Sequence, residues 1–114
     1  MATVYIRRFD LKESMSDAEV LDTWKFVMEE ALPAFQNVSG VRSVKLYSGA
    51  GGLRADLRLV VEMDDAGVYE RILADPGVRP VLGRAMNSID ARTSTQTFVR
   101  EVTPELIQAL GSSG

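Results

Sequence analysis

The sequence contains neither cysteine nor histidine. The lack of cysteine excludes disulfides, a thiol nucleophile and thiolate metal ligands. The lack of histidine removes the commonest metal ligand, the usual haem ligand and the side chain that titrates nearest neutral pH. We expect no cofactor and no metal, because Asp56 and Glu62 alone would make a weak set of metal ligands.

Positive charge is also in short supply, since 13 Lys and Arg residues stand against 16 Asp and Glu residues. This balance argues against a nucleic-acid-binding protein, which needs a basic face. No apolar run approaches the roughly 18 residues of a membrane span, and residues 1–4 enter a strand pattern without the features of a signal peptide. We therefore expect a cytoplasmic protein that binds neither nucleic acid nor membrane.

The chain of 114 residues suits one globular domain, and the sequence shows no linker, low-complexity segment or fixed-period repeat. We expect this domain to span residues 1–102. Thr103, Pro104 and Glu105 then resemble an N-cap and a first helical turn. Residues 103–114 are therefore expected to form a short C-terminal helix, ending near Gly111, and a flexible tail.

Alternation of side-chain character with a period of two residues predicts four strands. These strands cover residues 3–11, 41–48, 53–63 and 90–102. Apolar residues recur at helical spacing between the first two strands, over residues 20–35, which predicts a long amphipathic helix. Ser16 and Glu19 fit a capping box at its start, and Gly40 marks its end. Pro33 is expected to bend or tighten the last turn, because its nitrogen carries no hydrogen.

A second helical region follows the third strand, with Asp64 or Asp65 as its cap. Pro76 and Pro80 interrupt this region, so that a further short helix is expected over residues 81–86. Strand, helix, hairpin, helix and strand follow one another in the order of a split βαβ sandwich. We therefore predict an α+β, ferredoxin-like βαββαβ fold in which a four-stranded antiparallel sheet packs one face on two helices.

The two middle strands are joined by the glycine-rich residues 49–52. If these four residues are the whole loop, Leu46 faces Ala55 and Lys45 faces Asp56 across the hairpin. Apolar then meets apolar and cation meets anion, which favours this register. The loop joins two antiparallel strands and does not lead into a helix, so a turn is expected here and not a phosphate-binding loop.

The alternation divides the predicted sheet into two faces. The face expected against the helices is apolar and comprises Val4, Ile6, Val44, Leu46, Ala55, Leu57, Leu59, Val61 and Met63. The opposite face is expected to carry Tyr5, Arg7, Phe9, Lys45, Tyr47, Arg54, Asp56, Arg58, Val60, Glu62, Arg92, Gln96, Phe98 and Arg100. Four aromatic side chains that bury about 150–250 Å² each can exceed the roughly 300–600 Å² apolar patch usual on a monomer. We therefore expect a second copy to cover this face, which gives a face-to-face homodimer with a polar-lined cavity.

Two segments are typical of a known superfamily: Gly40–Tyr47 after the long helix, and Leu73–Arg79 in the second helical region. With these segments, the arrangement over residues 3–102 resembles the dimeric α+β barrel superfamily, in which two such sheets close face to face around cavities. Members include antibiotic-biosynthesis monooxygenases, haem-degrading enzymes and muconolactone isomerases. Histidine-dependent haem binding is not implied for this chain. Cofactor-free, quinone-forming oxygenation stays open, since an electron-rich phenol can itself activate oxygen.

Arginines of the second face are candidates to hold a small anionic or aromatic ligand. Arg7 and Arg58 offer guanidinium groups that stay charged and can grip an oxyanion with two donors. The alternative is that these arginines only pair with Asp56 and Glu62, because half-buried charges need partners in any case. Tyr5 is expected either to donate a hydrogen bond to the ligand or to fill space.

Three further residues complete the candidate site. Tyr47 has the same two possible roles as Tyr5, and Phe98, with Phe9, would supply apolar walls. Asp56 is the candidate general base if the interior is dry enough to raise its pKa, and otherwise an ordinary partner of Lys45. The sequence thus favours a cofactor-independent monooxygenase or isomerase acting on a small aromatic or polyketide-like anion. The alternative is a non-catalytic domain that binds a small molecule or only dimerises.

Overall fold

The computed structural model describes residues 2–49 and 51–113. Met1, Ala50 and Gly114, which belong to the predicted N-terminal segment, loop and tail, lie outside the described residues. The strands are β1 (Thr3–Leu11), β2 (Val41–Tyr47), β3 (Leu57–Met63) and β4 (Ile89–Arg100). They form one antiparallel sheet in the order β2-β3-β1-β4, so the ferredoxin-like α+β fold predicted from the sequence is confirmed.

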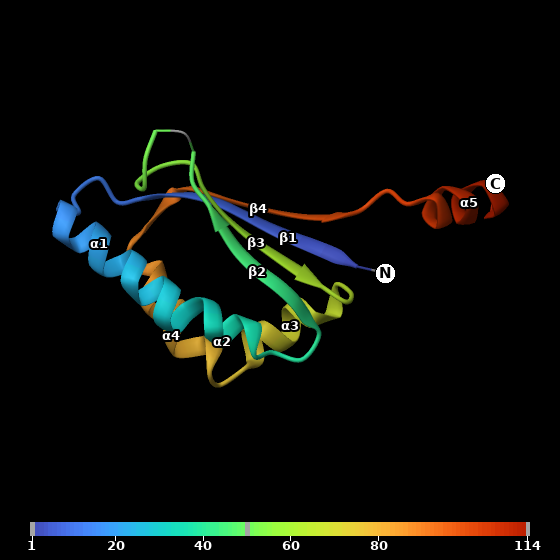
Figure 1. Ribbon diagram of the computed structural model, residues 1–114, viewed down its shortest axis with the longest axis horizontal. Helices are drawn as coiled ribbons and strands as arrows, with labels where there is room; N and C mark the ends of the chain where they lie inside the picture. The colour runs from blue at the N-terminus through green and yellow to red at the C-terminus, as the bar shows by residue number, and fades with distance from the viewer. Residues whose placement is uncertain (1, 50, 114) are drawn as a thin grey trace.

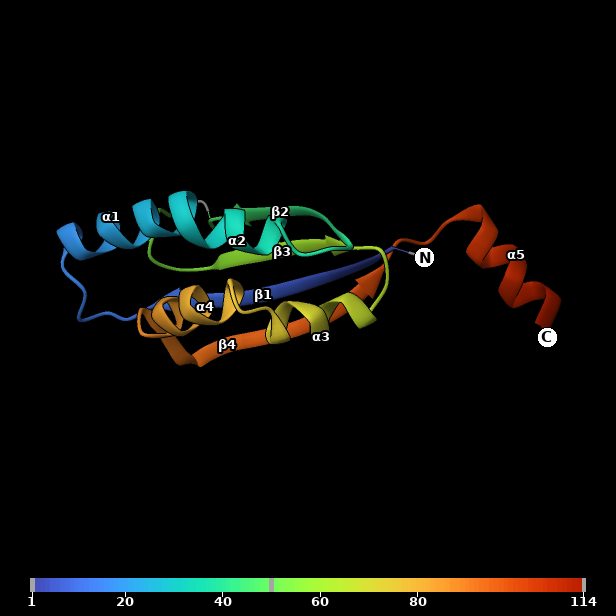
Figure 2. The same ribbon diagram turned by 90° about the horizontal axis from the view of Figure 1, so that it is seen from below.

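Helices cover a single face of this sheet (Figure 1). They are α1 (Asp17–Phe26), the π-helical turn η1 (Val27–Ala31), α2 (Leu32–Gln36), α3 (Gly67–Ala74) and α4 (Val78–Met86). A last helix, α5 (Pro104–Ser113), stands clear of the two layers beyond the end of β4 (Figure 2). No helix in the described part of the chain combines the length and the apolar character that crossing a membrane requires.

The first helical segment starts as the sequence predicts. The hydroxyl of Ser16 accepts a hydrogen bond from the amide of Glu19 at 3.2 Å, and the Glu19 carboxylate accepts from the amide of Ser16 at 2.9 Å. Ahead of Pro33, however, the helix widens into η1, where the amide of Leu32 donates to the carbonyl of Val27. The expected tightening is wrong: Pro33 has no amide hydrogen, and the turn before it opens into a π-bulge.

Aspartates begin the next two helices. The carboxylate of Asp65 accepts from the amide of Gly67 at 2.9 Å, directly at the start of α3. Asp75 accepts in the same way from the amides of Gly77 and Val78, at 2.8 and 3.1 Å. These hydrogen bonds hold the turn that leads into α4, which begins at Val78, earlier than the predicted helix, and accommodates Pro80 in its first turn.

The assignment of the two faces was wrong for β1 and β4. Tyr5, Phe9 and Leu11 are buried among the helices, whereas Val4 and Ile6 lie on the bare face. Alternation separates the two sets of side chains but does not say which set the helices cover. The bulkier set buries more apolar area and therefore turns inward. Phe98 pairs with Tyr5 across the β1–β4 ladder and consequently lies on the helix side as well.

The predicted hairpin register was also wrong, although its faces were correct. Leu46 pairs with Leu59 and Tyr47 with Arg58, so β3 begins at Leu57 and the connection is longer than the four glycine-rich residues. The displacement is even-numbered, which keeps Val44, Leu46, Leu59, Val61 and Met63 toward the helices. Ala55 lies in the connection and not in the sheet.

Contacts of Leu53 and Arg54 attach the connection between β2 and β3 to the rest of the fold. The carbonyl of Leu53 accepts from the indole nitrogen of Trp24 at 3.0 Å. The guanidinium of Arg54 pairs with Asp17, and the carbonyl of Arg54 accepts from the amide of Leu11 at 2.8 Å. These contacts fold the connection back onto the start of α1, so it cannot extend the β2–β3 ladder.

Candidate functional site

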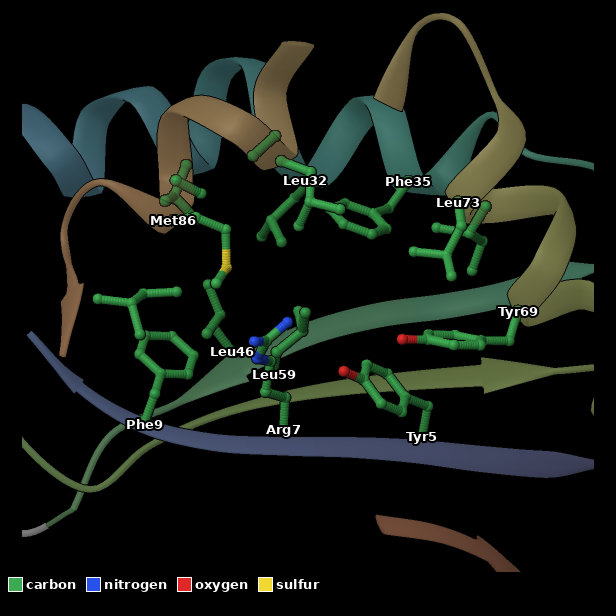
Figure 3. Close-up of a pocket in the computed structure, with 16 residues that line it drawn as sticks. Tyr5, Arg7, Phe9, Leu32, Phe35, Leu46, Leu59, Tyr69, Leu73 and Met86 are labelled. Atoms are coloured by element: carbon green, nitrogen blue, oxygen red, sulfur yellow. The ribbon is translucent and has the colours of Figure 1, made fainter. Parts of the chain in front are cut away.

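A cavity lies between the sheet and the helices at the middle of the fold (Figure 3). Its volume is about 80 Å³. The sheet contributes Tyr5, Arg7, Phe9, Leu46, Leu59 and Ile89, and the helices contribute Val27, Ala31, Leu32, Phe35, Tyr69, Ile72, Leu73, Leu82, Ala85 and Met86. The π-helical turn places Val27 and Ala31 in this wall, which agrees with the frequent occurrence of such turns at functional sites. The lining is apolar apart from three side chains.

Arg7 is the charged residue of this lining. The two-residue period of a strand fixes its side chain between those of Tyr5 and Phe9, on the face that the helices cover. Its Nε donates to the hydroxyl of Ser94 at 3.0 Å. Within residues 2–49 and 51–113, no carboxylate forms an ion pair with Arg7. A half-buried guanidinium that pairs with no carboxylate in this part of the chain, in an apolar wall, has the charge and the donors to hold an anion.

Two tyrosines converge beside this guanidinium. The hydroxyls of Tyr5 and Tyr69 both donate to the side-chain oxygen of Gln96, at 2.8 and 3.1 Å. Figure 3 shows both hydroxyls directed toward the part of the cavity that holds Arg7. The rings of Tyr5, Tyr69 and Phe98 pack together with centroids 4.9–5.1 Å apart. The aromatic cluster thus holds two hydroxyl donors in fixed positions.

Burial controls the ionisation of Tyr5. Loss of water around the phenol, with a smaller contribution from the neighbouring Tyr69, raises the pKa of Tyr5 to about 12, against a weaker opposing effect of Arg7. Tyr5 therefore keeps its proton at neutral pH and acts as a hydrogen-bond donor. A phenol in this state can stabilise an oxyanion but cannot remove a proton from a ligand.

The structure divides the residues that the sequence placed together. Tyr5, Arg7 and Phe9 line the cavity, and Phe98 packs on Tyr5 at its border. The remaining three, Tyr47, Asp56 and Arg58, line an open groove on the bare face of the sheet, together with Ile6 and Arg8. The two groups are therefore on opposite sides of one protomer and cannot contact one ligand within it.

Asp56 has different partners from the predicted one. Its carboxylate accepts from Nε of Arg8 at 3.0 Å and from Arg58 at 3.3 Å, so the expected pair with Lys45 is wrong. Its amide donates to Asp10 at 2.8 Å. Its φ of 53° is left-handed, and β3 begins at the next residue. Two guanidinium groups balance the charge of this carboxylate, which favours a structural role at this position.

Three residues of the cavity border were not predicted as site residues. Tyr69 lies in α3, within the predicted second helical region, and its hydroxyl donates to Gln96. Ser94 and Gln96 lie on β4, and only the pairing of β4 with β1 brings them next to Arg7 and Tyr5. In the described part of the chain, no group of three or more acids could hold a metal ion.

No protein family and no curated protein matches this sequence. Solved structures match it by shape. A dimeric protein of unknown function from Bacteroides fragilis has a TM-score of 0.70 and 14% identity, covering 88% of this chain and 96% of its own. A dimeric ferredoxin-like protein of unknown function from Thermobifida fusca has a TM-score of 0.69 and 14% identity, covering 89% and 92%. The chain shares their ferredoxin-like fold.

One further structure has a stated activity. SnoaB from Streptomyces nogalater, a cofactor-independent oxygenase, has a TM-score of 0.66 and 17% identity over 90% of this chain and 97% of its own. The resemblance to dimeric, ferredoxin-like and monooxygenase-like proteins is thereby confirmed for the fold. At this level of identity, the comparison carries no residue from those proteins to this chain.

Proposed function

We propose that the cavity between sheet and helices binds a small aromatic or polyketide-like anion, and that the protein oxidises this ligand with molecular oxygen and no cofactor. The observation that carries the proposal is Arg7, a guanidinium without a carboxylate partner among the described residues, set in an apolar cavity. Tyr5 and Tyr69 would donate to the same oxyanion. The likeness of the fold to a cofactor-independent oxygenase supports the choice of reaction.

The chemistry requires no electrons from the protein. A phenol with a free ring C–H para to its hydroxyl reacts with one O₂ to give a quinone and one water. The substrate loses four electrons and two hydrogens, and one oxygen atom enters the ring while the other leaves as water. Among the residues that the structure describes, the cavity lining holds no base, so the substrate would enter as a phenolate that has already lost its proton to water. Arg7 would stabilise this electron-rich phenolate, and the apolar walls would exclude bulk water from it.

Oxygen uptake with a panel of single-ring dihydroxyaromatics tests this proposal. The protein is expected to consume oxygen faster than the buffer does, and Arg7→Met is expected to lower the rate at least about tenfold, since a hydrogen bond to a charged group contributes about 1.5–3 kcal/mol. Arg79→Met, an exposed arginine of α4 outside the cavity, is the matched control and should keep the rate. Asp56→Asn should also keep the rate, and a loss of rate in this variant would place the reaction on the bare face.

The second candidate function is binding without turnover. An isomerase needs a group that accepts a proton, and the described residues that line the cavity include no carboxylate. This lining therefore favours binding over isomerisation. Under this alternative, aromatic acids raise the melting temperature while oxygen uptake stays at the rate of the buffer. The same two measurements therefore separate the oxygenase from the binding protein.

We also propose that the protein is a homodimer in which two copies cover each other's bare sheet faces. Val99 and Tyr47 are 41% and 51% exposed on this face, and Val4, Ile6 and Val60 are half-buried there. The structural neighbours described as dimeric support this assembly.

A further inference from the structure

The size of the cavity restricts what it can hold. Pockets for drug-sized ligands measure about 300–1,000 Å³, whereas this cavity measures about 80 Å³. Phe35, Ile72 and Phe9 form part of its wall and are themselves buried, so the wall cannot move outward without disrupting the core. A ligand with several fused rings therefore does not fit, and the size of the cavity limits a ligand to at most one ring.

The charge of the lining restricts the ligand further. Arg7, Tyr5 and Tyr69 are the titratable side chains of this lining, and all three present donors. A guanidinium offers donors and no acceptor, and burial holds the pKa of Tyr5 at about 12. No lining residue can accept a proton from a bound ligand at neutral pH. A neutral acid would therefore find hydrogen-bond donors but no base.

We infer that the natural ligand of this cavity is a compact, single-ring acid that is already ionised in neutral water and binds with its oxyanion against Arg7. This inference rests on the proposed function, because it assumes that the cavity is the ligand site. Tyr5 and Tyr69 turn their hydroxyl hydrogens from Gln96 to the same oxyanion. The ring lies against the leucines and Phe9 of the lining.

Binding of three matched probes tests the inference on the unmodified protein. Benzoate carries the charge on one ring, benzamide has the same shape without the charge, and 2-naphthoate adds a second ring. Titration calorimetry is expected to give benzoate at least about a tenfold lower Kd than benzamide, because charge-assisted hydrogen bonds are roughly twice as strong as neutral ones. Benzoate should also bind at least about tenfold more tightly than 2-naphthoate, because the second ring exceeds the cavity of about 80 Å³. Arg7→Met should remove the preference for benzoate over benzamide, whereas Arg79→Met should preserve it.

Each other result contradicts a defined part of the account. Equal binding of benzoate and benzamide would overturn the inference about charge but leave the cavity as a ligand site. Tighter binding of 2-naphthoate would overturn the inference about size. If none of the three probes binds, the cavity is not a small-molecule site, and the proposed function fails with the inference. The comparison of probes on the unmodified chain decides these points even if Arg7→Met does not fold.

Discussion

Gly40→Ala is expected to lower the free energy of unfolding by about 2–6 kcal/mol. Gly40 has a φ of 93°, a left-handed conformation that costs a residue with a Cβ about 1–3 kcal/mol. A Cβ at this position would also lie 2.6 Å from Cγ2 of Val68, which is fully buried in α3. Overpacking of this kind costs a further amount of about 1–3 kcal/mol. Urea unfolding followed by circular dichroism measures the loss.

Gly83→Ala provides the matched control with an expected effect of opposite sign. Gly83 lies inside α4, and a Cβ there meets no atom within 4 Å. Alanine in a helix interior is favoured over glycine by about 0.8–1.0 kcal/mol, so this variant should be slightly more stable. If both variants change stability equally, the close approach of α3 to the turn before β2 does not contribute as described.

Ile6→Lys is expected to convert the dimer into monomers. Ile6 lies on the bare face of the central strand β1, opposite Val60 of β3 and Thr97 of β4. In the proposed dimer, this position is buried against the second copy, near the cations Arg8 and Arg58. An unpaired buried charge costs about 3–5 kcal/mol. Since about 1.4 kcal/mol corresponds to a tenfold change, the dimer dissociation constant should rise at least about 100-fold.

Sedimentation at micromolar concentration measures this change directly. The unmodified chain should sediment at twice the 12.5 kDa mass of one protomer. Leu21→Lys is the control, because Leu21 is 63% exposed on α1, away from the sheet. A monomer in the unmodified chain, or a dimer that tolerates lysine at position 6, would contradict the face-to-face arrangement.

The element order could be predicted because local signals specify it. The capping box of Ser16 and Glu19 and the left-handed stop at Gly40 depend on neighbouring residues, and both lie where the sequence indicates. The register of the hairpin depends on contacts far away in the chain. The hydrogen bond of Trp24 and the ion pair of Arg54 hold the connection on α1, and no pattern within the two strands indicates these contacts.

The candidate site could be predicted only in part, for a related physical reason. A strand period of two places Arg7 with Tyr5 and Phe9 wherever the strand lies, so these three were correctly grouped. The period does not indicate which face the helices cover. Tyr47 was therefore grouped with Tyr5 and Arg7, although it lies on the opposite face of the sheet. Tyr69 comes from α3, and its position over Tyr5 depends on packing that a single sequence does not reveal.

Fluorine NMR of the protein labelled with 3-fluorotyrosine tests the location of the ligand site most directly. The chain has three tyrosines, of which Tyr5 and Tyr69 line the cavity and Tyr47 lies on the bare face. Tyr→Phe variants assign the three signals, and benzoate is then titrated. The signals of Tyr5 and Tyr69 are expected to shift while that of Tyr47 stays in place. A shift of Tyr47 alone would place the ligand on the opposite face of the sheet and contradict the cavity as the ligand site.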